Sequence, residues 1–155
     1  MKTRALIQIL VLSTSFAFSQ SSFKVVEEPL PYSQWATSYT TDIIGQDENF
    51  IVYHWQKFIE DHKGVSYVKS VEKGNVALES EHVEFPILNN EKVTCFTRFT
   101  PNRTESGVLM TLWIKQADGT FFSSKNHKDS GQKIKTWLLK FNQSLEKANE
   151  KLLHS

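Results

Sequence analysis

The chain is poor in the residues that cross-link small proteins. Among its 155 residues there is one cysteine, Cys95, so no disulfide can form within the chain. Cys95 stands in an alternating strand pattern between Val93 and Phe99, which predicts a small buried hydrophobic residue and not a reactive thiol. Without a disulfide the fold must depend on an apolar core, which a chain of this length can build.

A large excess of either charge is also missing. The chain has 18 basic and 17 acidic side chains. Loss of the N-terminal segment described below would remove Lys2 and Arg4, which leaves 16 basic against 17 acidic side chains and a net charge of −1. Nucleic-acid binding requires a basic surface, so we expect no nucleic-acid partner.

Long hydrophobic runs are absent as well. The run from Ala5 to Leu12, broken only by Gln8, is too short to cross a bilayer. Basic residues precede it, and Ala17-Phe18-Ser19 places small residues at the two positions that a signal peptidase reads. We therefore expect residues 1–19 to be a secretory signal peptide. This implies export to the periplasm or the extracellular space, with no transmembrane segment in the mature chain.

Prolines are few, and two of them stand close together near the start. Pro29 and Pro31 exclude a central strand, so we expect residues 20–33 to be a leader or edge strand, followed by a single domain over residues 34–155. Apolar residues on both faces of the segment 108–115 predict the centre of a sheet. The expected strands are 35–43, 65–72, 76–83, 85–88, 92–100, 108–115 and 120–123.

Apolar residues at steps of three and four predict two amphipathic helices. The first runs from Glu48 to Lys63, with Asp47 as its N-cap. The second runs from Ser130 to Leu152, with Asp129 as its N-cap and Gln132 at capping-box spacing. Its apolar stripe is expected to cover the sheet and comprises Ile134, Trp137, Leu138, Phe141, Leu145, Ala148 and Leu152.

These segments predict an α+β fold: an antiparallel sheet of about five strands with both helices on one face, in β-α-β4-α order. This order resembles one half of the TATA-binding-protein fold and, less closely, the helix-grip fold of lipid-transfer proteins. The segments 112–114 (Leu-Trp-Ile) and 121–124 (Phe-Phe-Ser-Ser) and the lysine-rich final helix carry a second resemblance, over residues 48–152. It is to small uncharacterised secreted or periplasmic α+β proteins of gram-negative bacteria, and it implies a fold and a location but no activity.

The densest polar stretch, residues 123–130, leads into the final helix. Free amides at a helix N-terminus attract anions, so Ser124, Lys125, His127 and Lys128 are the candidate ligand-binding residues. The same stretch contains the residue types of nucleophilic catalysis, and His127 or Asp129 would serve a hydrolase-like enzyme. It lacks a G-x-S-x-G nucleophile elbow, and we assign no catalytic residue.

The histidines are not spaced for a metal site. His54 and His62 are eight residues apart on the first helix, whereas zinc usually draws on closer pairs with a third ligand. We therefore expect no metal and no cofactor. Four tryptophans are expected in the core or around an apolar pocket, namely Trp35, Trp55, Trp113 and Trp137.

The export signal, the α+β pattern and the lack of a catalytic motif favour a non-enzymatic secreted or periplasmic binding module. Its target would be a partner protein or a small apolar ligand. Two alternatives stay open. One is a small hydrolase-like enzyme that uses the stretch 123–130, and the other is a purely structural protein associated with the cell envelope.

Overall fold

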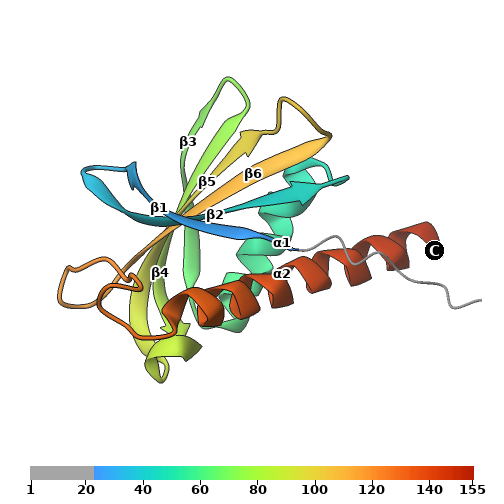
Figure 1. Ribbon diagram of the computed structural model, residues 1–155. Helices are drawn as coiled ribbons and strands as arrows, with labels where there is room; N and C mark the ends of the chain where they lie inside the picture. Colours follow the sequence, from blue (N-terminus) through green and yellow to red (C-terminus); the bar gives the residue numbers. More distant parts are fainter. Residues whose placement is uncertain (1–22) are drawn as a thin grey trace, which may run out of the picture.

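Six strands form one antiparallel sheet, and two helices cover one of its faces (Figure 1). The computed structural model describes residues 23–155, so the expected signal peptide lies outside the described residues. Neighbouring strands follow the order β1-β2-β6-β5-β4-β3. The elements are β1 (Val25–Pro31), β2 (Trp35–Ile44), α1 (Glu48–Asp61), β3 (Val65–Glu72), β4 (Asn75–Phe85), η1 (Pro86–Leu88), β5 (Glu91–Pro101), β6 (Gly107–Lys115) and α2 (Ser130–Leu153).

The α+β class and the antiparallel sheet agree with the sequence prediction, but the sheet has six strands and not about five. β4 continues to Phe85, and the strand expected at 85–88 is replaced by the 3₁₀ turn η1, because Pro86 has no N–H for a sheet ladder. The return strand expected at 120–123 is also wrong. Within the described residues only one bridge forms, between Lys115 and Phe121, because β2 already occupies that side of β6 as far as Leu112.

β6 lies inside the sheet, as its two apolar faces predicted. Leu112 and Ile114 point toward the helices, whereas Trp113 belongs to a separate apolar cluster on the opposite face. All three side chains are buried. The sheet therefore has a covered face, which carries the main core, and a second face that no helix covers, which we call the open face.

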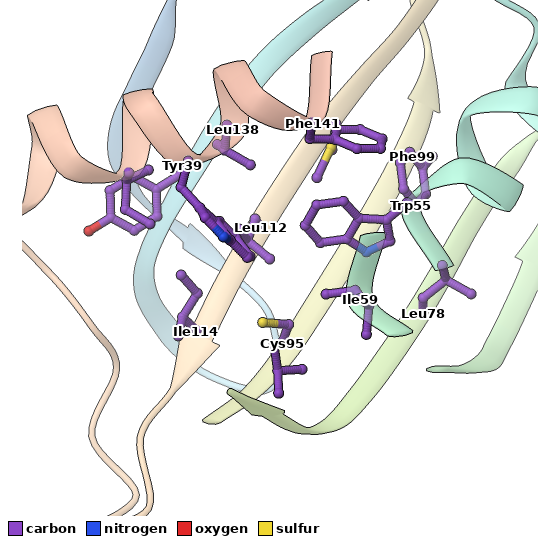
Figure 2. Packing of buried hydrophobic residues seen from close by; sticks show 14 of the residues in the cluster. Tyr39, Trp55, Ile59, Leu78, Cys95, Phe99, Leu112, Ile114, Leu138 and Phe141 are labelled. Carbon is purple, nitrogen blue, oxygen red and sulfur yellow. The ribbon is translucent and has the colours of Figure 1, made fainter. Parts of the chain in front are cut away.

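The main core is centred on an indole ring from α1. Trp55 is fully buried and packs edge-on against Phe141 of α2, with ring centroids 5.0 Å apart. Figure 2 shows Trp55 between Phe141 and Ile59, above the strands that carry Leu78 and Phe99. The rings join both helices to the sheet, so the packing of the two helices is a single cooperative unit.

The apolar stripe of α2 is buried from Ile134 to Leu145, as predicted. Its last member is wrong, because Leu152 is 61% exposed. Figure 1 shows the reason: the C-terminal turns of α2 extend past the edge of the sheet. Sequence periodicity gives the face of a helix but not the point at which its partner surface ends.

One of the two predicted helix caps forms. The Asp47 carboxylate accepts the N–H of Asn49 at 2.9 Å and that of Phe50 at 3.4 Å, so α1 begins as predicted. Asp129 adopts a left-handed conformation with φ of 60° and makes no side-chain cap hydrogen bond, so the predicted capping box with Gln132 is wrong. The start of α2 is held by another acidic residue, described below.

The two edges of the sheet differ. β1 contains Pro29 and Pro31, which offer no N–H to an approaching strand, as is common at protected edges. β3 contains no proline, and Val65, Tyr67, Val68 and Val71 along it are about half exposed or more. The β3 edge is therefore apolar and keeps its backbone donors, although its register against β4 shifts between Val68 and Ser70.

Burial makes the only cysteine unreactive. Cys95 lies in the main core, where desolvation raises the pKa of its thiol to about 12. We therefore expect no maleimide labelling of the native protein at pH 8 over an hour and complete labelling in urea, as measured by mass spectrometry. Complete labelling of the native protein within minutes would show that the core opens readily.

Candidate functional site

The predicted ligand-binding residues of the stretch 123–130 differ in their exposure and contacts. Ser124, Lys125 and Lys128 are exposed, and only His127 is half-buried. The His127 ring stacks on Phe122 with centroids 4.9 Å apart, and its Nε2 lies 3.2 Å from the side-chain oxygen of Gln116. These contacts hold the loop against the body of the protein and leave the two lysines directed to solvent.

The N-terminus of α2 already has an anion of its own. The Glu27 carboxylate, from β1, accepts the Ser124 N–H at 2.8 Å and the Tyr39 hydroxyl at 3.4 Å. Its other oxygen is 3.7 Å from where a Cβ of Gly131, in the first turn of α2, would stand. A carboxylate of the protein itself therefore stands beside the first turn of α2, where a negative charge is favourable.

Glu27 also acts on the buried tyrosine beside it. Burial raises the pKa of the Tyr39 phenol far above its ordinary value, and the negative charge of Glu27 raises it further. The phenol therefore stays protonated and remains a hydrogen-bond donor to the carboxylate. This arrangement fastens β1 and β2 to the start of α2.

The histidines have structural contacts. His62 places Nδ1 2.7 Å from the carbonyl oxygen of Phe58, and its Nε2 accepts the indole N–H of Trp137 at 3.1 Å. Both ring nitrogens of His62 are thus used within the fold. Within residues 23–155, no three His, Cys, Asp or Glu side chains gather in a way that could hold a metal ion.

A different group of side chains gathers on the open face of the sheet. Phe96 and Trp113 are buried there together with Ala36, although no helix covers this face. Leu30 and Phe121 pack against them. The alternation of side chains along β6 indicates this second cluster, since Trp113 points to the opposite face from Leu112. What sequence could not reveal is that the β1–β2 turn folds over the cluster.

That turn brings an aromatic ring across the sheet. Tyr32 lies with its ring centroid 4.3 Å from that of Phe96 and 5.5 Å from that of Trp113. The Trp113 indole N–H donates to the carbonyl of Leu30 at 3.3 Å, which holds β1 over the same cluster. Figure 1 shows the β1–β2 turn and the β6–α2 loop at the same end of the sheet.

Between these two loops lies a hollow of about 240 Å³, which we call the open-face cleft. Rings and polar groups both reach it, so it can receive an apolar group and fix its orientation. Its walls come from the β1–β2 turn, β5, the end of β6 and the following loop. The residues that line it are Tyr32, Ser33, Gln34, Phe96, Lys115, Gly119 and Phe121.

Charged groups surround the aromatic cluster without filling the cleft. Arg98 stands over the Trp113 ring at 5.1 Å, a cation–π contact. Lys69 and Glu79 form an ion pair at 3.0 Å beyond Tyr32. Burial, and then the charge of Glu79, raise the pKa of the Tyr32 phenol, so this side chain is neutral at physiological pH.

A second hollow lies at the opposite end of the open face. It measures about 560 Å³ and is bordered by Asp42, Leu109 and the β5–β6 loop. Asn102, in that loop, uses its side-chain amide to bond Asp42 at 3.1 Å and its oxygen to accept from Thr104 at 2.9 Å. This hollow is the larger of the two and has apolar lining from Ile44, Pro101 and Leu109, but no aromatic ring lines it.

The four tryptophans separate into two groups. Trp55, Trp113 and Trp137 are buried, as predicted, whereas Trp35 is 72% exposed and belongs to neither cluster. Trp35 pairs with Pro31 where β1 and β2 meet their turn, at the end of the hairpin. The expectation of a core position for Trp35 is therefore wrong.

Comparison of the chain with protein families, curated proteins and solved structures finds no match. Among residues 23–155, no helix combines the length and the apolar character needed to cross a membrane.

Proposed function

We propose that this chain is an exported binding module without catalytic activity and that the open-face cleft is its binding site. The observation that carries the proposal is the gathering of Tyr32, Phe96 and Phe121 around a hollow on the uncovered face of the sheet. Aromatic rings beside a few polar groups are typical of binding sites. The small volume suits a single ring, from a small ligand or from a side chain of a partner protein.

The contacts of the polar stretch favour binding over hydrolysis. His127 bonds Gln116, and Asp129 turns into a left-handed conformation without a cap bond. The Glu27 carboxylate stands beside the first turn of α2. A hydrolase that used this stretch would need a nucleophile beside the histidine, and Nε2 of His127 lies beside the side-chain oxygen of Gln116 instead.

The proposal includes the export of the protein and its relation to a group of known proteins. The features of residues 1–19 support secretion to the periplasm or the extracellular space. The segments 112–114 and 121–124 support kinship with the small secreted proteins of gram-negative bacteria. From β2 onward, the order of elements resembles that of half a TATA-binding-protein fold and, less closely, that of the helix-grip fold. The cleft, however, lies on the face opposite the helices, so the order alone does not specify the ligand.

Titration with a neutral ring compound tests the proposal. We expect indole at millimolar concentration to shift the amide resonances of Ser33, Gln34 and Gly119 in ¹H–¹⁵N NMR spectra. Replacing Tyr32 by Ala removes one wall of the cleft and should weaken binding about tenfold, since burying an aromatic side chain contributes roughly 1.5 kcal/mol or more.

Tyr53→Ala is the control, because Tyr53 is an exposed tyrosine on α1 that does not line the cleft. It should bind indole as the wild type does. Shifts that cluster elsewhere, or equal binding by the Tyr32→Ala and Tyr53→Ala proteins, would refute the assignment of the cleft.

A further inference from the structure

We infer that the ligand of the open-face cleft is a small aromatic carboxylate, with its ring against Tyr32, Phe96 and Phe121 and its carboxylate facing Lys115. This inference rests on the proposed function and adds the chemical class of the ligand. It follows from the charge, the size and the polar groups of the cleft.

The charge of the cleft comes from the end of β6. Lys115 is the last residue of β6 and lines the cleft. Alternation along the strand places its side chain on the open face, as for Trp113 two residues earlier. Within residues 23–155, no acidic side chain lies within 4.0 Å of its amine, although the sheet pairs Lys69 with Glu79.

The same cleft holds no carboxylate. Its other polar members, Ser33 and Gln34, can donate hydrogen bonds to an anion. Asp118, which precedes the lining residue Gly119, uses its carboxylate to accept the N–H and the hydroxyl of Thr120. An unpaired cation beside hydrogen-bond donors, in a cleft that no carboxylate lines, favours a negative ligand group over a positive one.

The rings and the size of the cleft define the rest of the ligand. The rings of Tyr32 and Phe96 are inclined by 32° to each other, and Phe121 lies on the loop that faces them. A hollow of about 240 Å³ is below the usual range of drug-sized pockets, so one ring with a short acidic arm suits it. Gly119 leaves the rim open, because no atom lies within 4 Å of where its Cβ would stand.

Four ligands and three proteins test the inference by ¹H–¹⁵N NMR titration. Phenylacetate is compared with neutral phenylacetamide, with the saturated cyclohexylacetate and with indole. The proteins are the wild type, Lys115→Gln and the control Lys140→Gln, in which the lost lysine is an exposed residue of α2. Both variants change exposed side chains, and circular dichroism checks that they fold.

In the wild type we expect phenylacetate to bind about three- to fivefold more tightly than phenylacetamide, the range for a partly exposed ion pair. The ratio of the affinity for phenylacetate to that for phenylacetamide should fall to about one in Lys115→Gln and should be unchanged in Lys140→Gln. Cyclohexylacetate should bind more weakly than phenylacetate.

Equal affinities for phenylacetate and phenylacetamide in the wild type would overturn the inference and leave the proposed function standing. A preference for phenylacetate that survives in Lys115→Gln would overturn the role of Lys115. If no ring compound, indole included, perturbs the cleft, the proposed function fails and the inference fails with it.

Discussion

Replacing Trp55 by Ala is expected to lower the free energy of unfolding by about 3–5 kcal/mol, the range for loss of a large aromatic side chain from a core. Trp55 is fully buried and contacts the rings of Phe58, Trp137 and Phe141. Its removal leaves a cavity where α1, α2 and the sheet meet (Figure 2). Urea unfolding followed by circular dichroism measures the change.

Trp35 supplies the matched control for this substitution. It is the same residue type but 72% exposed, so Trp35→Ala should cost less than about 1 kcal/mol. Equal losses for Trp35→Ala and Trp55→Ala would contradict the position of Trp55 at the centre of the core. A Trp55→Ala protein that is unfolded in buffer is also consistent with the prediction, because the expected loss of free energy approaches the total stability of a small domain.

Replacing Gly107 by Ala is expected to cost about 2–6 kcal/mol, since it combines backbone strain with a steric overlap. Gly107 opens β6 opposite Ile44 and has φ of 133°, a conformation that residues with a Cβ rarely adopt. An added Cβ would overlap the carbonyl oxygen of Ile43 and stand 2.9 Å from the Cα of Ile44. Both contacts are with backbone atoms, which cannot move without breaking the pairing of β2 with β6.

The variant Gly119→Ala separates the cost of backbone strain from the cost of steric overlap. Gly119 also has a positive φ, of 86°, but no atom lies within 4 Å of its Cβ position. It should therefore show only the cost of the backbone conformation, about 1–2 kcal/mol. Thermal and urea unfolding of the two variants provide the comparison. A loss for Gly107→Ala no larger than that for Gly119→Ala would mean that the strand pairing tolerates the added methyl group.

Local patterns in the sequence were sufficient for most of the fold. The α1 cap at Asp47, the buried stripe of α2 and the central position of β6 follow from residue types and spacings within a single element. The predictions were wrong where contacts between segments far apart in the sequence determine the structure. The Thr120 return strand fails because the neighbours of β6 come from β2 and β5, and Leu152 is exposed because the sheet ends before α2 does.

The candidate site was less predictable for the same reason. The stretch 123–130 is dense in polar residues, but the carboxylate that accepts the Ser124 N–H comes from Glu27, almost a hundred residues earlier. The open-face cleft joins the β1–β2 turn to residues of β5, β6 and the following loop. The segment 108–115 is apolar on both faces, but nothing local in the sequence indicates that Tyr32 folds across the sheet to meet Trp113.

The unequal edges of the sheet limit how copies of this protein could join. A second copy can add its own β3 to β3 of the first, since this edge keeps its donors and its exposed valines. The joined sheet would then end in β1 on both sides, and the prolines of β1 offer little to a third copy. Strand addition between native molecules would therefore stop at a pair and would not continue into a fibre.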